Sequence, residues 1–150
     1  MRISAKITGL SSMITKNNAL QRALEEEAGD IVAMAAFATQ AIAIRSIARQ
    51  GSSSGQSIRY RPKRTVKVSS PGHPPNADTG RSIQSIQVEV DKEKKQALVG
   101  SNLKYMAWLE LGTADMGARP WLLPAARAHA KQMAEDFKKS VQKTIRKILK

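Results

Sequence analysis

A stretch without proline, from about Asn17 to Gln50, constrains the fold of this chain more than any other feature. Its apolar residues recur at helical spacing, at Leu20, Leu24, Ile31, Ala35, Ala38 and Ile42. Asn17 or Asn18 can cap the start, and Glu25–Glu27 fall in the early turns, where the helix dipole favours acidic side chains. The many alanines indicate close packing against another element. We therefore expect one long helix, with Gly29 as a weak point where it can bend.

Short strand patterns flank and follow this helix. Ile3, Ala5 and Ile7 alternate with polar residues and predict an edge strand. The tract QGSSSG at 50–55 ends the helix, and two strands at 58–60 and 66–68 are expected around a basic turn at 62–64. A second hairpin is expected from 82–90 and 97–100, with a bulge or a helix-to-strand change near Ser85.

Two further helices are predicted in the last third of the chain. A short one spans Leu103 to Leu111 and is closed by Gly112. The last begins near Pro124 and runs to the C-terminus. Its apolar stripe consists of Met133, Phe137, Val141, Ile145 and Ile148. We interpret this stripe as core packing, with a membrane-surface or partner-helix role as the alternative.

Together these elements predict a single α+β domain over residues 1–150. A small antiparallel sheet packs against a long N-terminal helix and a C-terminal helix, with a long basic loop or hairpin between them. Residues 51–77 form a flexible basic excursion and a proline arm. Aromatic residues make up only 4% of the 150 residues, so the core is thin. Such a core suits a subunit that buries further apolar surface against neighbouring subunits.

The charge distribution points to partners. The net charge is +13, and the seven charged residues between Asp30 and Asp78 are all basic. After Asp136 the chain carries only basic charges as well. Nucleic acid and acidic protein surfaces are the partners that such blocks favour. No segment approaches the length of a membrane span, and the start lacks the apolar stretch of a signal peptide, so we expect a cytoplasmic product and no membrane partner.

The residues give no catalytic constellation. There are no cysteines, and His73 and His129 lack metal-ligand spacing with any carboxylate. The string Asp78-Thr79-Gly80 matches aspartic proteases, but that chemistry needs two such carboxylates, each after an apolar strand. The other interpretation is that Asp78 or Thr79 caps or turns the chain. We expect no enzyme activity, no metal and no cofactor.

The loops carry a resemblance to a known family. SPGHPP at 70–75 precedes DTGRSI at 78–83, and then come Tyr105, LELGT at 109–113 and ARPWLLPA at 118–125. In this order and spacing they resemble the neck and tail-completion proteins of tailed bacteriophages. The matching residues are Pro71, Gly72, Pro74, Pro75, Thr79, Gly80, Arg81, Tyr105, Glu110, Gly112, Thr113, Arg119, Pro120, Trp121 and Pro124. Ser82, Met106, Leu111 and Trp121 depart from the residues that the family prefers.

The resemblance implies a structural virion protein that forms a ring at the head–tail junction, is assembled in the host cytoplasm and helps join tail to head. Six-fold symmetry is favoured over twelve-fold. Its partners would be itself, neighbouring neck and tail proteins, and passing double-stranded DNA bound non-specifically. Five basic residues would contact DNA in the lumen or an acidic partner: Arg59, Arg61, Lys63, Arg64 and Lys67. The alternative is a cellular basic nucleic-acid-binding protein.

The motif residues also have structural interpretations. Gly112 would supply a left-handed turn. Glu110 and Arg119 could form a charge-assisted pair that closes that turn, or remain two solvated charges. Trp121 would anchor the loop in the core or at an interface. The segment from Pro71 to Pro75 would be an extended arm, ordered in advance, that docks on a neighbour at low entropic cost.

Overall fold

The computed structural model describes residues 10–51, 54–60 and 63–149. The elements in chain order are α1 (Leu10–Ala48), β1 (Gly55–Tyr60), β2 (Lys63–Val68), α2 (Arg81–Gln84), β3 (Ile86–Asp91), β4 (Gln96–Ser101), α3 (Lys104–Leu111) and α4 (Leu123–Leu149). The predicted edge strand at Ile3–Ile7 lies outside the described residues.

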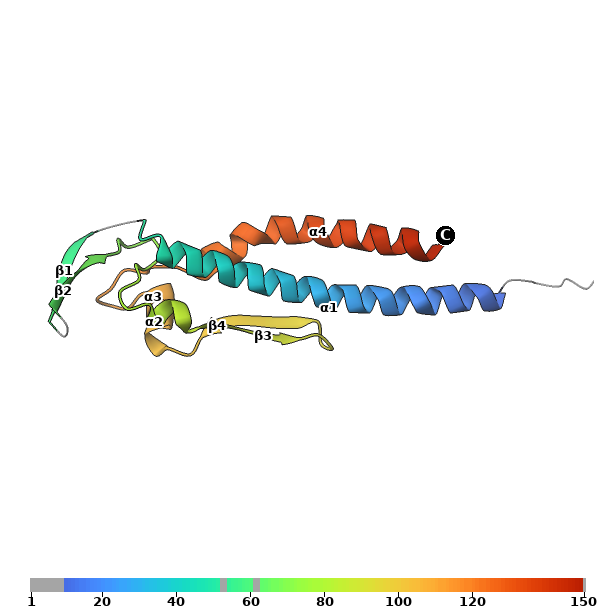
Figure 1. Cartoon of the computed structure of the whole chain (residues 1–150), viewed down its shortest axis with the longest axis horizontal. Coiled ribbons are helices and arrows are strands. Elements are labelled where there is room, and N and C mark those ends of the chain that lie inside the picture. The colour runs from blue at the N-terminus through green and yellow to red at the C-terminus, as the bar shows by residue number, and fades with distance from the viewer. Residues whose placement is uncertain (1–9, 52–53, 61–62, 150) are drawn as a thin grey trace, which may run out of the picture.

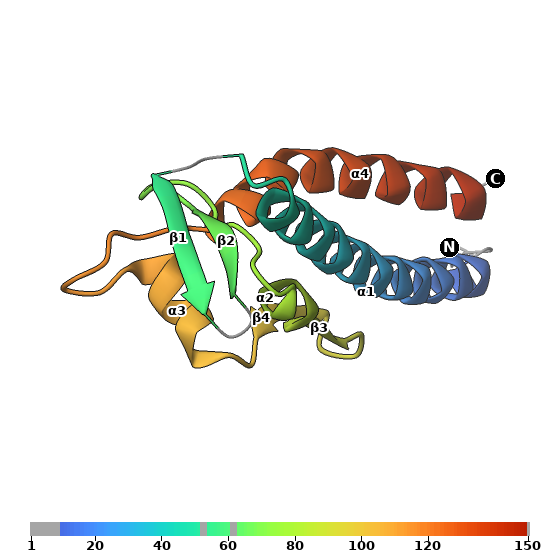
Figure 2. The ribbon, with the colours of Figure 1, turned by 60° about the vertical axis from the view of Figure 1, so that its left-hand side comes forward.

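Helix α1 is the central layer of an elongated molecule (Figure 1). Helix α4 lies along one side of α1 and runs antiparallel to it, and the β3–β4 hairpin lies along another side. The β1–β2 hairpin projects from the end of the molecule where α1 finishes, close to α3 (Figure 2). The predicted α+β arrangement, with both long helices and a small antiparallel sheet, is confirmed.

Both predicted hairpins are present. Strand β1 pairs with β2 from Gly55↔Val68 to Tyr60↔Lys63, and β3 pairs with β4 from Ile86↔Ser101 to Asp91↔Gln96. They form two separate two-stranded sheets. The predicted helix-to-strand change near Ser85 is also confirmed, because α2 ends there and β3 begins at the next residue.

Helix α1 is longer than the sequence predicted. It begins at Leu10, so Asn17 and Asn18 lie inside it and the prediction that one of them is the N-cap is wrong. The helix is continuous through Gly29, which is buried under the β3–β4 turn. A Cβ at this position would lie 3.2 Å from the backbone oxygen of Lys92. Gly29 therefore serves a close approach between helix and hairpin, which offsets its low helix propensity.

The core lies where α1, β3, α3 and the start of α4 meet. Its buried residues are Ala43, Ile47, Ile86, Met106, Trp121 and Ala125. The predicted apolar stripe of α4 is buried only in part, since Met133 and Phe137 stay 39% and 46% exposed. The β3–β4 hairpin lies along a different side of α1 from α4 (Figure 1), and Met133 lines an open groove together with Ala97 and Val99 of β4.

Helix α1 is also apolar enough to cross a membrane by length and composition. An 18-residue window within Ser11–Ala48 has a mean hydropathy of 1.7, and only 22% of that window is buried. The expectation that no segment approaches such a span is therefore wrong. The same helix supplies Ala43 and Ile47 to the core, so it is at once a core helix and an incompletely covered one.

Candidate assembly site

Two halves of the loop motif, distant in sequence, meet at the end of the molecule that carries the β1–β2 hairpin. We call the contact region the motif junction and define it as residues 69–72, 109–113 and 117–123. Its hydrogen bonds join the proline arm to the loop between α3 and α4 and join the last turn of α3 to the N-terminus of α4.

Glu110, in the last turn of α3, caps α4. Its Oε2 accepts hydrogen bonds from the backbone N–H groups of Trp121 at 2.7 Å and Leu122 at 2.9 Å. Its Oε1 accepts a third from the N–H of Leu123 at 2.9 Å. The first N–H groups of a helix have no partners within the helix, and the dipole favours negative charge there. One carboxylate from α3 thus fixes where α4 begins and in which direction it leaves.

Arg119 binds backbone carbonyls and not Glu110, so the predicted Glu110–Arg119 pair is wrong. Its Nε donates to the oxygen of Ser69 at 3.1 Å, and an Nη donates to the oxygen of Gly117 at 3.1 Å. Its own backbone N–H donates to the oxygen of Leu109 at 2.6 Å. Glu110 and Arg119 therefore both form hydrogen bonds with main-chain groups. A guanidinium suits this task because its several donors point in fixed directions.

Gly112 ends α3 with a positive φ of 79° and a ψ of 178°. This backbone conformation is almost confined to glycine. A Cβ here would lie 2.9 Å from the backbone nitrogen of Ala118 and 2.9 Å from the oxygen of Met116. The prediction of a left-handed turn at this glycine is wrong in its ψ, which is extended, although the positive φ that favours glycine is present. The chain then folds back tightly, with the N–H of Thr113 donating to the oxygen of Met116 at 2.9 Å.

Trp121 is 4% exposed, and its Nε1 donates to the oxygen of Met106 at 3.0 Å. Of the two predicted places for this anchor, the structure gives the core. The Trp121 side chain thus attaches the α3–α4 loop to α3, the helix that also supplies Glu110 as the cap of α4. Pro120 precedes it in the loop, and Pro124 lies in the first turn of α4 as predicted.

The proline arm docks on its own chain. The N–H of Gly72, at a φ of 80°, donates to the oxygen of Ala118 at 2.7 Å. A Cβ at Gly117 would lie 2.9 Å from the Cβ of Pro71, so these two segments are in close contact. Pro75 is buried and Pro74 is half-buried. The arm that was expected to be free to dock on a neighbour is thus held at its start by the motif junction.

Asp78 joins the arm to the basic hairpin. Its carboxylate accepts two hydrogen bonds from Arg64, from Nε at 2.8 Å and from Nη2 at 2.9 Å, and lies 3.9 Å from Nε of Arg59. The hydrogen bond from Arg64 lowers the pKa of Asp78, and the same bond raises the pKa of Arg64. The expectation that Asp78 or Thr79 caps or turns the chain before Arg81 holds for the turn, since the chain bends over residues 78–80, and is wrong for the cap. At α2 the N-cap is Gly80, at a φ of 79°, without a side-chain cap.

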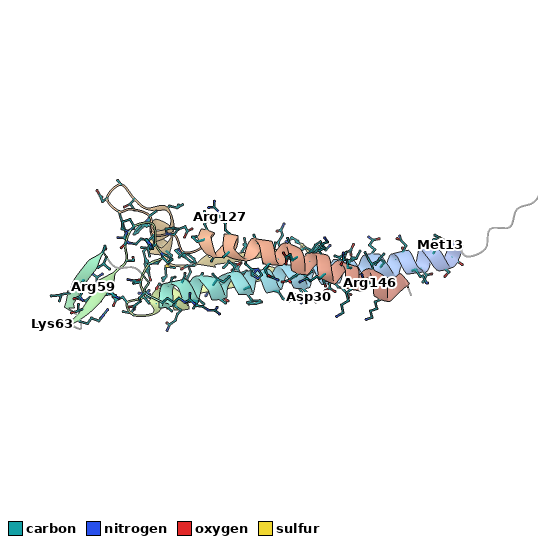
Figure 3. All side chains as sticks on the ribbon, turned by 90° about the horizontal axis from the view of Figure 1, so that it is seen from above. Met13, Asp30, Arg59, Lys63, Arg127 and Arg146 are labelled. Carbon is teal, nitrogen blue, oxygen red and sulfur yellow. The ribbon has the colours of Figure 1, made fainter. Side chains whose placement is uncertain are left out.

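The remaining predicted residues lie around these contacts. Arg59 and Lys63 stand at the projecting end of the molecule (Figure 3). Lys63 and Lys67 are exposed, Thr79 and Arg81 are exposed, and Arg61 lies outside the described residues. Tyr105 is 36% exposed on the outer face of α3. The five predicted basic residues therefore include two, Arg64 and Arg59, that form ion pairs with Asp78 and two lysines that are exposed.

Several structural residues were missed by the sequence reasoning. The buried hydroxyl of Ser85 lies 2.7 Å from that of Ser101, which also accepts the N–H of Leu103 at 3.2 Å. Trp108 is 56% exposed on α3. Trp108 lies three residues after Tyr105, on the side of α3 away from the buried Met106. This spacing is the sequence signal that could have predicted its exposure.

Among the described residues, no group of three or more His, Asp or Glu side chains is placed to hold a metal ion. Comparisons of the chain with protein-family models, with curated proteins and with solved structures give no match.

Proposed function

We propose that this chain is a structural subunit that forms a ring at the head–tail junction of a tailed bacteriophage, as a neck or tail-completion protein. The observation that carries the proposal is the motif junction. The motif pieces that resemble this phage family, SPG at 70–72, LELGT at 109–113 and ARPW at 118–121, contact one another through Glu110, Arg119 and Gly72. The contact between Gly72 and Ala118, which lie far apart in sequence, is what a shared fold would require of the motif.

The basic hairpin supports a role beside DNA. It projects from the body and presents Lys63 and Lys67 to solvent, while Asp78 binds Arg64 near the turn between β1 and β2. Projecting lysines attract phosphate without reading sequence. In a ring, the hairpins would line the DNA exit path or contact acidic surfaces of the adjoining neck and tail proteins.

A first experiment tests the phage role. Particles made from a phage genome with a stop codon in this gene are expected to accumulate as separate heads and tails, and the protein supplied in trans should restore joined particles. Electron microscopy of the lysates gives the count. Normal joined virions in the absence of the protein would refute the proposal.

A second experiment separates the proposal from a cellular nucleic-acid-binding protein, which the net charge of +13 also favours. The chain is titrated against duplex DNA at two salt concentrations, and its molecular mass is measured by light scattering. A ring subunit should be oligomeric and bind free DNA weakly. Tight binding by a monomer, falling steeply with salt, would favour the cellular function.

A further inference from the structure

Part of helix α1 has no charged residue on any side, although one of its sides faces solvent. Residues 31–44 include no Asp, Glu, Lys or Arg. The sheet covers one side, where Gln40 donates to the oxygen of Ile86 at 2.8 Å. Helix α4 covers another, where Ser140 donates a hydrogen bond to the carboxylate of Glu27. A helix that is apolar all round is normally buried all round, so a covering over the exposed side is missing from the isolated chain.

The uncovered side of α1 is a ridge of apolar side chains, which we define as Met34, Phe37 and Ala41. Met34 is 59% exposed and Phe37 is 55% exposed, and Ala41 is exposed as well. Along the same row of the helix the ridge is bounded by Asp30 at one end and Arg45 at the other, both exposed. An apolar centre with charged ends is the usual composition of a protein–protein contact.

The second surface is an apolar groove of about 450 Å³ between α1, β4 and α4. Small side chains form much of its wall, and the lining residues include Val32, Ala35, Thr39, Val99, Ala130 and Met133. On α1, Thr39 is buried and Val32 and Ala35 are half-buried, whereas Ala130 and Met133 of α4 are exposed. The groove is therefore a hollow between packed elements that is open on its α4 side.

The ridge and the groove lie at the same height on roughly opposite sides of α1, because successive helix residues are about 100° apart and the two rows interleave between Val32 and Ala41. One surface is raised and built of large side chains, and the other is hollow and built of small ones. Translation and rotation of a second copy can therefore place the ridge of one subunit in the groove of the next.

We infer that the ridge of each subunit inserts into the groove of a neighbouring copy of the same chain. This contact is heterologous, so every subunit uses both surfaces and the series closes into a ring when the rotation between subunits is right. A two-fold dimer built on either surface alone would leave the other in water. The inference deepens the proposed function by naming the surfaces that join the ring, and it rests on that function only for the expectation of closure.

The test uses one variant on each surface, in the full chain. Phe37→Arg places a charge on the ridge and leaves the groove intact, whereas Ala35→Arg fills the groove and leaves the ridge intact. Wild type is expected to form a closed oligomer by light scattering, and each variant alone should be monomeric. An equimolar mixture should give a one-to-one dimer, because one intact ridge can still meet one intact groove. Leu98→Arg is the matched control. Leu98 is 70% exposed on the face of β4 opposite the groove, so this variant should keep the wild-type mass.

A crosslinking experiment gives a second measurement that does not depend on loss of assembly. The chain has no cysteine, so a Phe37→Cys and Ala35→Cys double variant should oxidise to a ladder of disulfide-linked multimers, and each single variant should stay uncrosslinked. Circular dichroism checks that each variant is folded.

Three outcomes would overturn the inference. They are assembly of Phe37→Arg at the wild-type mass, crosslinking of the Phe37→Cys single variant into dimers, and a monomeric wild type that floats with phosphatidylcholine–phosphatidylglycerol vesicles. The last would mean that lipid covers the exposed side of α1. Failure of the phage role is distinguishable, because joined virions without the protein would leave the ridge-and-groove oligomer intact.

Discussion

The motif junction and the middle of α1 differ in how completely a single chain packs and hydrogen-bonds each of them. At the junction the main chain is held by side chains of the same chain, with Glu110 accepting three N–H groups and Arg119 donating to two carbonyl oxygens. In the middle of α1, Met34 and Phe37 have no covering layer. The junction therefore holds the fold together, whereas under our inference the exposed side of α1 is a surface through which subunits associate. Substitutions at the first should lower stability, and substitutions at the second should change the assembly only.

The largest effect is expected from Gly112→Ala. The added Cβ would meet backbone atoms of Ala118 and Met116 at 2.9 Å, and a positive φ is strained for alanine. We expect a loss of about 3 kcal/mol or more in the free energy of unfolding. Urea denaturation followed by circular dichroism measures it. Gly51→Ala is the control, since a Cβ there meets nothing within 4 Å. Equal stability of the two variants would show that the turn is not the constraint.

Glu110→Ala is expected to be the next most damaging. It leaves three N–H groups at the start of α4 without their carboxylate partner, and we expect a cost of roughly 2 kcal/mol. Glu110→Gln keeps the acceptor oxygen and should cost less. Denaturation midpoints of both variants give the comparison. A cost for Glu110→Gln as large as for Glu110→Ala would mean that the charge outweighs the hydrogen bonds.

The tether between the arm and the hairpin should depend on pH. Because the hydrogen bond from Arg64 lowers the pKa of Asp78, the tether is intact above the ordinary aspartate pKa near 3.8 and is lost as the pH falls through the lower, folded value. Limited proteolysis between 51 and 77 should therefore accelerate only in strong acid. Asp78→Asn should show faster cleavage already at neutral pH. Unchanged cleavage in Asp78→Asn would mean that the hairpin is held by other contacts.

The smallest effect on stability is expected on the ridge. Met34→Lys changes an exposed side chain that has no covering layer, so its free energy of unfolding, measured on the monomer, should stay within about 0.5 kcal/mol of wild type. Its oligomer mass should fall as for Phe37→Arg. A loss of stability comparable to that of Glu110→Ala would show that the ridge packs within its own chain and would remove the contrast between the two regions.

The secondary structure was predictable because each element carries its own local pattern. Alternation marked both hairpins, and a glycine closed α3 where one was expected. The start of α1 was misjudged because asparagines that can cap a helix can also lie within one. Such residues mark a boundary only where further helical turns would add no stability.

The contacts of the candidate site were less predictable because they join residues distant in sequence. The sequence identified Glu110 and Arg119 as motif residues but paired them with one another, since nothing local distinguishes a side-chain partner from a backbone one. The bond between Arg64 and Asp78 was missed for the same reason. The uncovered side of α1 was missed because periodicity marks apolar positions without saying which neighbours cover them.

The carboxylate of Glu110 also has a mechanical consequence. It fixes one end of α4, a helix of 27 residues that is about 40 Å long, and the further turns of this helix lie along α1. On a helix of that length, a difference of about 5° in starting direction would move the far end, near Arg146, by about 3.5 Å. The direction that Glu110 sets at the start of α4 therefore decides where its lysine-rich end meets α1, and the hydrogen bond from Ser140 to Glu27 holds the helix there.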